Sequence, residues 1–180
     1  MNNHINIKTD RLLIRILEMK DKEDFFEYRS MPEIHQYQSW RPKQISEIEE
    51  FIDKNVTVYP NTENKWLQLA VCLNEGQMIG DIGIHFMEDK QIEIGYTLSP
   101  KYQGNGYASE AVKAVINYVF SEWKKHRITA SVDPDNIQSI KLLERIGFRS
   151  EAHFIKSFRI DDQWYDDCIY ALLEDEWKTY

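Results

Sequence analysis

The hydrophobic pattern along the chain changes its period at Pro100. Before that residue, apolar runs are separated by the turn signals Asn74-Glu75-Gly76 and Glu88-Asp89-Lys90, which is typical of an antiparallel meander. We expect its strands at residues 66–73, 78–86 and 91–98. After Pro100, apolar residues recur at steps of three and four, which predicts a long amphipathic helix from about residue 108 to about residue 123.

Shorter patterns predict the remaining elements. Strands are expected at residues 12–16, 127–132, 149–160 and 164–172, and helices at 22–29, 45–55 and 137–146. Pro32 should prevent the first of these helices from continuing, and Gly147 should end the last one. The final two strands form a hairpin around the turn Asp161-Asp162-Gln163.

The order of these elements predicts one domain over residues 1–180, of the α+β (mixed α/β) class. A strand, a crossover helix and another strand normally become parallel neighbours with a right-handed connection. Strands 91–98 and 127–132 should therefore lie side by side and parallel, within a sheet that is otherwise mostly antiparallel.

Composition excludes several classes of protein. The chain has 180 residues, 42% of them hydrophobic, which is long enough for a sizeable core. A net charge of −8 argues against a nucleic-acid partner and favours cationic ones. No apolar run reaches the ~20 residues that span a membrane, and the polar residues 1–6 do not resemble a signal peptide. Two distant cysteines and five scattered histidines predict no metal site and a cytoplasmic location.

The segment after the third meander strand carries the clearest chemical signal. Gly104 and Gly106 follow a strand and precede the long helix, so that backbone N–H groups of the turn and of the first helical turn can converge on an anion. The alternative is a tight turn without a ligand. A Walker loop is absent, and Ser109 occupies the position of the third glycine in a dinucleotide fingerprint. We therefore expect this loop to bind a phosphate group of a ligand that neither a Walker loop nor a dinucleotide fingerprint would hold.

The string Gln103-Gly104-Asn105-Gly106-Tyr107-Ala108 matches the Gln/Arg-x-x-Gly-x-Gly/Ala motif of the GNAT superfamily. Residues 93–98 resemble that family's fourth strand, and residues 135–148 resemble its second CoA-contacting segment. Residues 9–15 resemble the RimJ/RimL branch, which acetylates the N-termini of ribosomal proteins. The resemblance implies a GNAT-type fold, with a central mixed sheet flanked by helices, and transfer of acetyl from acetyl-CoA to a primary amine.

The resemblance also implies which residues hold the co-substrate. The pyrophosphate would meet Gln103, Gly104, Asn105, Gly106, Tyr107 and Ala108, and the pantetheine arm would meet Tyr96, Thr97, Leu98 and Asn136. Asn136 also fits a helix cap. Gly95 suggests a bulge that splays two strands and supplies an N–H to the thioester carbonyl, with a simple packing glycine as the alternative.

Two residues are expected to carry the chemistry. Glu93 is the expected general base, directly or through water, and the alternative is an ion pair with an arginine or lysine. Many family members have a tyrosine that protonates the departing thiolate at the position of Leu143, and leucine cannot do so. Ser139, one helical turn earlier on nearly the same face, is the expected substitute, and water is the alternative.

The branch resemblance makes a protein N-terminal amine the expected acceptor. Its pKa of about 7.7–8.0 leaves more of the neutral, nucleophilic form than a lysine side chain does. The alternatives are a polyamine or aminoglycoside, or a non-catalytic CoA-binding sensor, which the leucine at position 143 favours. A homodimer is compatible with the branch. The residues expected near an acceptor are Trp40, Trp66, His85, His153, Phe154, Asp161, Asp162, Tyr165, Asp166 and Asp167.

Overall fold

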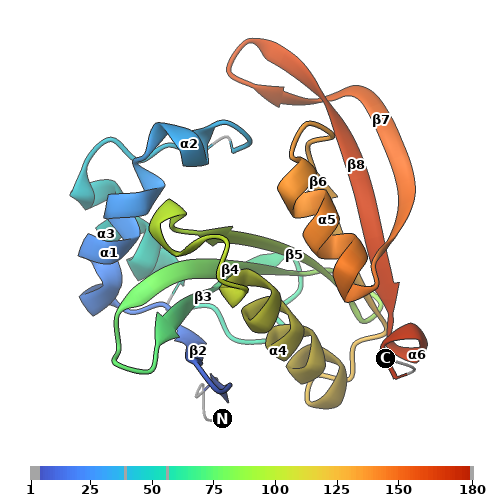
Figure 1. Ribbon diagram of the computed structural model, residues 1–180, viewed down its shortest axis with the longest axis horizontal. Helices are drawn as coiled ribbons and strands as arrows, with labels where there is room; N and C mark the ends of the chain where they lie inside the picture. Colours follow the sequence, from blue (N-terminus) through green and yellow to red (C-terminus); the bar gives the residue numbers. More distant parts are fainter. Residues whose placement is uncertain (1–4, 39, 56, 179–180) are drawn as a thin grey trace.

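A computed structural model describes residues 5–38, 40–55 and 57–178; residues 1–4 of the polar start, and with them His4, lie outside the described part. Eight strands form one sheet in the order β1-β2-β3-β4-β5-β6-β8-β7. Every neighbouring pair is antiparallel except β5 with β6. Figure 1 shows this sheet with helices around it and the β7–β8 hairpin rising from the body. The predicted mixed sheet is confirmed.

The element boundaries agree closely with the hydrophobic pattern. The strands are β2 Leu12–Ile16, β3 Lys65–Leu73, β4 Met78–Phe86, β5 Gln91–Leu98, β6 Arg127–Val132, β7 Arg149–Ile160 and β8 Gln163–Leu173. The helices are α1 Lys22–Arg29, α3 Ile45–Asn55, α4 Tyr107–Ser121 and α5 Ile137–Ile146.

Short elements escaped the sequence prediction. These are β1 Asn6–Lys8, α2 Pro32–His35, α6 Glu174–Trp177 and the 3-10 turns η1 Met19–Asp21 and η2 Pro100–Tyr102. None is longer than four residues, which is too short for a period to be read. Pro32 does separate two helices, but it also begins the second one, where its missing N–H costs nothing.

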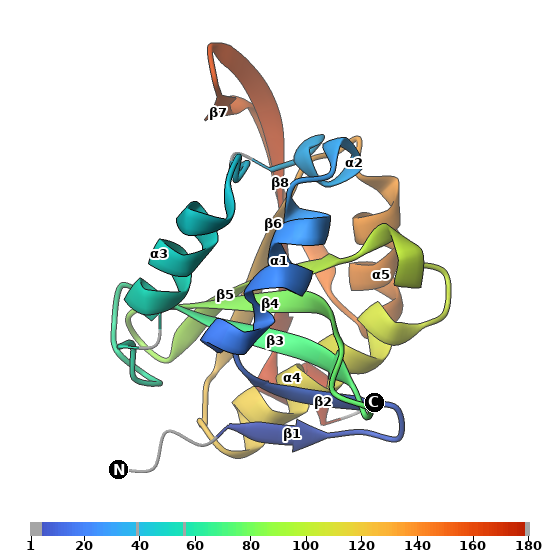
Figure 2. The same cartoon turned by 90° about the vertical axis from the view of Figure 1, so that its left-hand side faces the viewer.

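Two apolar layers cover the two faces of the sheet. Alternate residues of β3 show this: Leu69 and Val71 pack with α4 and α5, whereas Ala70 and Cys72 pack with α1 and α3. Figures 1 and 2 place these helix pairs on opposite sides of the strands. The parity of a residue on a strand therefore decides which layer it faces. No helix in the described part is long and apolar enough to cross a membrane.

The ladder that joins the parallel strands β5 and β6 is shorter than either strand. Ladder pairing runs only from Gln91–Arg127 to Glu93–Thr129, and the strands then diverge. The Thr129 hydroxyl donates to the Ile92 carbonyl (3.3 Å) at this last rung. The predicted bulge at Gly95 is wrong, because β4 and β5 pair without a register shift from Phe86–Ile92 to Gly80–Leu98. The end of the β5–β6 ladder, and not a bulge, separates the strands.

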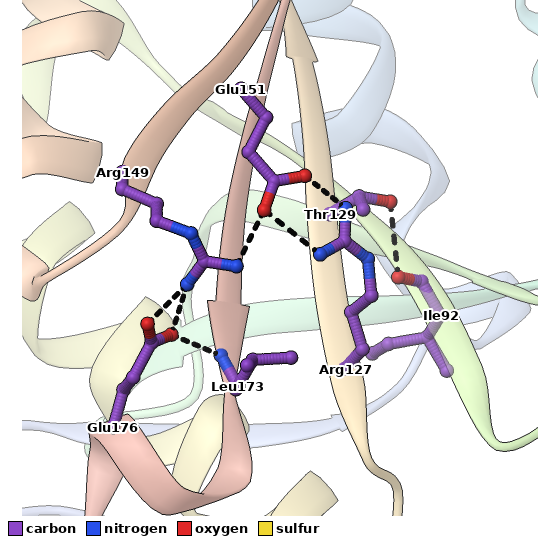
Figure 3. A network of polar contacts seen from close by, with 7 residues as sticks. All are labelled: Ile92, Arg127, Thr129, Arg149, Glu151, Leu173 and Glu176. Carbon is purple, nitrogen blue, oxygen red and sulfur yellow. Dashed lines mark hydrogen bonds and ion pairs between the residues drawn. The ribbon is translucent and has the colours of Figure 1, made fainter.

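A chain of ion pairs fastens the second half of the sheet (Figure 3). Glu151 of β7 accepts from Arg127 of β6 (3.0 Å to Nη1) and from Arg149 of its own strand. Arg149 also reaches Glu176 of α6, which accepts from the Leu173 backbone at 2.7 Å. The Arg127 guanidinium, helped by Arg149, lowers the pKa of Glu151 to about 2. The network ties β6, β7 and the chain end together across β8.

Replacing Glu151 by glutamine should make the free energy of unfolding less dependent on pH in the acidic range. A carboxyl group whose pKa is lower in the folded state stabilises the fold above its unfolded pKa of about 4.3, and this contribution disappears as pH falls toward about 2. We expect Glu151→Gln to lose about 1 kcal/mol near neutral pH, since the pair is partly exposed. Thermal unfolding followed at a series of pH values should show the two curves converging below about pH 4. Glu75→Gln, in an exposed turn, serves as the control; a constant difference at every pH would contradict the assignment.

Candidate active site

The glycine-rich loop has the geometry of an anion cradle. Gly104 (φ +79°) and Gly106 (φ +81°) are left-handed, a backbone conformation in which side chains are strained. The N–H groups of Tyr107, Ala108 and Ser109 precede the first bond of α4, which runs from Glu110 N to Gly106 O (3.0 Å). These groups lie at the positive end of a fifteen-residue helix.

Side chains around the loop hold it in place. Arg11 donates to the Asn105 carbonyl (2.9 Å), pairs with Glu110 and lies over the Tyr107 ring. The Gln103 side chain turns back and donates to the Leu98 carbonyl (3.0 Å) at the end of β5. The predicted loop residues therefore lie together, with the N–H groups at the start of α4 unpaired within the helix and the Arg11 guanidinium close by. This arrangement fits the pyrophosphate of a CoA thioester.

The free edge of β5 begins where the parallel ladder ends. The Ile92 carbonyl points toward β6, where Thr129 reaches it. Because backbone groups alternate along a strand, those of Ile94, Tyr96 and Leu98 also point into the gap. The backbone of Tyr96 therefore lies along the free edge, and the Leu98 carbonyl at its end accepts from Gln103. Thr97 differs, because its backbone faces β4, where it pairs with Asp81.

A pocket of about 290 Å³ occupies the gap between β5 and β6. Asn136 and Ser139 of α5 line it on one face of the sheet, and Trp66, Gln68 and Asp81 line it on the other. Gly95 lies between them, and a Cβ built there meets no atom within 4 Å. The pocket therefore connects the two faces, so that two reactants can approach each other from opposite sides of the sheet.

Glu93 lies at the point where the strands diverge, beside the residues that line the pocket. Its Oε2 is 3.7 Å from Nδ1 of His85, and the His85 ring stacks on Trp66 (centroids 4.9 Å apart). Burial raises the pKa of Glu93, and His85 partly opposes this shift. The expected alternative, a pair with arginine or lysine, is wrong, since the neighbour is a histidine. A carboxylate with a raised pKa is better suited to accept a proton near neutral pH.

A buried ion pair forms the back of the pocket. Asp81 accepts from Tyr28 (2.6 Å to Oη), from Arg29 (3.0 Å to Nε) and from Gln68. Arg29 also donates to the Gln38 side chain, whose Nε2 donates to the Thr97 hydroxyl (2.8 Å). Burial alone would lower the pKa of the Arg29 guanidinium. The charge and hydrogen bond of Asp81 have the larger effect, so the pKa is raised. The pair thereby fixes Gln38 at the pocket wall.

Two consecutive aspartates of β8 line the pocket, and their side chains point to opposite faces of the strand. Asp167 shares the face of Ser131, opposite to the layer of α4 and α5. Asp166 accepts from His153 Nε2 (2.8 Å) and from the Lys156 N–H (2.9 Å), and Asp167 accepts from the Ser131 hydroxyl (2.7 Å). The Lys156 N–H and His153 lower the pKa of Asp166. Both aspartates line the pocket, as expected for a site that receives a cation.

Most of the other residues expected near an acceptor lie elsewhere. Trp66 lines the pocket, whereas Trp40 stacks on Phe51 (4.5 Å) in the layer of α1 and α3. The remaining ones, none of which lines the pocket, are His85, His153, Phe154, Asp161, Asp162 and Tyr165. Aromatic residue type alone does not distinguish a pocket wall from a core position.

The start of α5 brings the predicted Asn136 and Ser139 together. Asn136 is the helix cap, with its Oδ1 accepting from Ser139 N (3.2 Å), and it also lines the pocket. Ser139 Oγ is 2.7 Å from the phenolic oxygen of Tyr96. Leu143 is fully buried and lines the pocket without offering a donor. Ser139 thus places a hydroxyl one helical turn from Leu143, the position at which many family members have a tyrosine.

Sequence reasoning missed several polar residues of the pocket, which are Arg29, Tyr37, Gln38, Gln68, Asp81, Ser131 and Asp133. A signal for one of them was present, since Asp81 interrupts an otherwise apolar strand, and a carboxylate on a buried strand needs a partner. The partners come from α1 and from Gln68 of β3, and no local pattern connects α1 with β4. Among the described residues, no group of three or more His, Cys, Asp or Glu is arranged to hold a metal ion.

Comparison with known proteins agrees with this geometry. Residues 11–149 match the family model described as an acetyltransferase (GNAT) domain. An uncharacterized N-acetyltransferase, YnaD, of Bacillus subtilis is 34% identical over 97% of this chain and 100% of its own length. The [ribosomal protein uS5]-alanine N-acetyltransferase of Escherichia coli is 27% identical, covering 96% of this chain and 93% of its own length.

Solved structures show the same fold. A GNAT-family acetyltransferase from Bacillus anthracis superposes with a TM-score of 0.86 at 36% identity, over 96% of this chain and all of that one. The spermidine N-acetyltransferase of Vibrio cholerae, solved with CoA and spermine, gives a TM-score of 0.81 at 22% identity, over 94% and 99% of the two chains. The splayed strands, the glycine loop and these similarities lead to one conclusion: the chain belongs to the GNAT family of N-acetyltransferases.

Proposed function

We propose that this enzyme transfers the acetyl group of acetyl-CoA to the α-amino group of a protein N-terminus, in the cytoplasm. The observation that carries the proposal is the pocket that joins the two faces of the sheet between β5 and β6. The thioester enters from the side of α4 and α5, and the amine enters from the side of Trp66 and Asp167. Two buried free cysteines, Cys72 and Cys168, fit a reducing compartment.

The proposed reaction is direct attack by a neutral amine. Backbone N–H groups of residues 103–108 bind the pyrophosphate, and the free edge of β5 with Asn136 holds the pantetheine arm. An N–H on that edge, from Ile94 or Tyr96, polarises the thioester carbonyl. The C–N bond forms as the C–S bond breaks, and the electron pair of that bond stays on sulfur. Glu93 takes the surplus proton of the nitrogen through water, because Glu93 lies beside the pocket rather than in its lining.

Ser139 stabilises the leaving sulfur by donating a hydrogen bond, and water protonates the free thiolate when CoA departs. A hydrogen bond is sufficient, without proton transfer from Ser139, because a thiol with a pKa near the cysteine value of about 8.5 is a good leaving group as the thiolate. The other carboxylates near the amine have different roles. Asp81 is occupied by Tyr28, Arg29 and Gln68. Asp167 accepts from the Ser131 hydroxyl, and its charge attracts the cationic substrate.

A polyamine is the second candidate acceptor, and Asp167 favours it. This carboxylate lies on the amine side of the pocket and fits a substrate that carries a second positive charge. The protein N-terminus remains the first candidate acceptor for two reasons. The similarity to the E. coli ribosomal-protein enzyme covers nearly the whole length of both chains. An α-amino group also has a lower pKa than the side-chain amine of lysine, so more of it is neutral near pH 7.

The deciding experiment is a thiol-release assay with acetyl-CoA and a panel of amines. The panel contains ribosomal-protein N-terminal peptides, their N-formylated forms, spermidine, an aminoglycoside and free lysine. We expect turnover with the free peptides and none with the blocked ones. Turnover with spermidine alone would establish the second candidate. CoA binding by calorimetry without turnover on any amine would contradict the proposed chemistry and favour a sensor.

Replacing Glu93 by glutamine should separate catalysis from stability. A general base contributes about 10²–10⁴-fold, so we expect kcat to fall by about 10²-fold. Because burial raises the pKa of Glu93, its ionised form destabilises the fold above that pKa, and the amide should leave the melting temperature unchanged or higher. The wild-type rate should rise with pH through this raised pKa, and the variant should lose that limb of the profile.

Glu88→Gln, in the exposed turn before β5, is the matched control and should change neither the rate nor its pH profile. If Glu93→Gln retained the wild-type rate at every pH, Glu93 would not be the base, although the enzyme assignment would stand.

A further inference from the structure

One tyrosine and one serine from distant parts of the chain share a short hydrogen bond at the pocket. Tyr96 is on β5 and Ser139 on α5, and their hydroxyl oxygens are 2.7 Å apart. The Tyr96 hydroxyl also lies 3.3 Å from the Ser139 carbonyl, a longer and weaker contact. Both residues line the pocket in which the thioester is expected to react. The catalytic scheme above gives the Tyr96 side chain no role.

The surroundings of Ser139 decide where its hydroxyl hydrogen points. A helical serine usually donates to the carbonyl three or four residues earlier. Here the Asp135 carbonyl already accepts from Ile137 N (2.9 Å) and from the Tyr37 hydroxyl (3.2 Å). The Asn136 carbonyl accepts from Ile140 N (3.1 Å), and the Asn136 side chain is engaged by the Ser139 N–H. Both lone pairs of the Asp135 carbonyl, one of the two usual acceptors for this hydrogen, are therefore occupied.

The distance between the two hydroxyl oxygens allows either to donate, and we take the Tyr96 hydroxyl as the donor. Burial raises the pKa of Tyr96 to about 12, so the phenol keeps its proton at any working pH. A phenol has one hydrogen to give, and the nearest acceptor is Ser139 Oγ. When Tyr96 donates to that oxygen, the serine hydrogen must take another direction, and the pocket is the side on which both residues are open.

We propose that Tyr96 is a positioning residue that orients the Ser139 hydroxyl toward the sulfur of the thioester. The inference rests on the proposed function and deepens it. As the C–S bond breaks, the sulfur gains the electron pair and Ser139 donates a hydrogen bond to it without losing its proton. Leu143, the next pocket residue of α5, has no hydrogen to donate, so the pair supplies the donor that the leucine lacks.

The test compares Tyr96→Phe, Ser139→Ala and the double variant. The first readout is the pKa of the thiol of bound CoA, followed by the ultraviolet absorbance of the thiolate during titration. A donor aimed at sulfur stabilises the thiolate, so the bound thiol should have a lower pKa than free CoA. Each single variant should return that pKa toward the free value, and the double variant should change it no further.

The second readout separates kcat from KM. We expect each single variant to lower kcat by about tenfold, the effect of one hydrogen bond, with KM for acetyl-CoA changed by less than about twofold. The double variant should match Ser139→Ala, because two residues that act through one hydrogen bond are not additive. Tyr118→Phe on α4, away from the pocket, is the matched control and should leave both readouts unchanged.

Each outcome has a distinct meaning. A bound thiol with the pKa of free CoA in the wild-type enzyme, or additive losses in the double variant, would overturn the role of Tyr96 and leave the enzyme assignment intact. The thiol titration needs only bound CoA, so it remains informative if the amine acceptor has been assigned incorrectly. Absence of CoA binding to the folded wild-type chain would instead contradict the proposed function itself. Melting temperatures of all variants identify any that fail to fold.

Discussion

Gly106→Val should lose CoA binding by at least about 100-fold, because the loop can no longer present its N–H groups together. Gly106 has φ +81° at the N-cap of α4, a conformation in which a β-branched side chain is a severe outlier. A Cβ there would also lie 3.4 Å from the Arg11 guanidinium. Moving the loop to relieve this strain would turn the helix N-terminus away from the phosphates. Calorimetric titration with CoA measures the loss.

Gly76→Val provides the matched control for this prediction. Gly76 has a similar left-handed backbone (φ +102°), and a Cβ built there meets nothing within 4 Å. It lies in the turn between β3 and β4, away from the pocket. Both variants should lose about 1–3 kcal/mol of stability from backbone strain, but only Gly106→Val should lose CoA. Wild-type affinity in a folded Gly106→Val protein would show that this loop does not bind the pyrophosphate.

Asp81→Ala should destabilise the fold by about 3–5 kcal/mol, since it leaves the Arg29 charge buried without its partner. The same change removes the acceptor of the Tyr28 hydroxyl and of the Gln68 amide. A domain of this kind is stable by only about 5–15 kcal/mol, so the variant should be near the limit of folding. Urea denaturation followed by circular dichroism measures the change in the free energy of unfolding.

Two further variants test whether the unpaired Arg29 charge causes this loss of stability. Adding Arg29→Met to Asp81→Ala removes both charges and should recover much of the stability. Asp162→Ala breaks a pair with Arg159 in which both side chains are largely exposed, and it should cost less than about 1 kcal/mol. If Asp81→Ala cost no more than Asp162→Ala, the buried pair would not be important to the fold.

The order and type of the longer elements were predictable from the sequence because their signals are local. The three- and four-residue spacing from Ala108 onward describes one face of α4, and the alternation in β3 assigns its residues to two layers. The glycine loop was predictable for the same reason: its strand, turn and helix are consecutive, and its chemistry comes from the backbone. The resemblance then pointed to Asn136 and Ser139, which lie together at the N-cap and in the first turn of α5.

Other parts of the site could not be read from the sequence. Gly95 suggested a bulge, yet the strands separate because the β5–β6 ladder stops at Glu93–Thr129, which depends on how β6 is held by β8. Glu93 was expected to face an arginine or lysine if it were structural, and its neighbour is His85, placed by the register of β4 against β5. These outcomes follow from strand pairing, and a strand's sequence does not state where its ladder ends.

By itself, the sequence determined the longer helices and strands, the mixed sheet and the strand–turn–helix order of the glycine loop, since each depends on residues close together in the chain. Only the tertiary structure decided what meets at the pocket. The contacts from Gln38 to Thr97 and from Tyr96 to Ser139 join residues 59 and 43 positions apart. Each such contact depends on the packing of whole elements against one another, and packing has no local signature in the sequence.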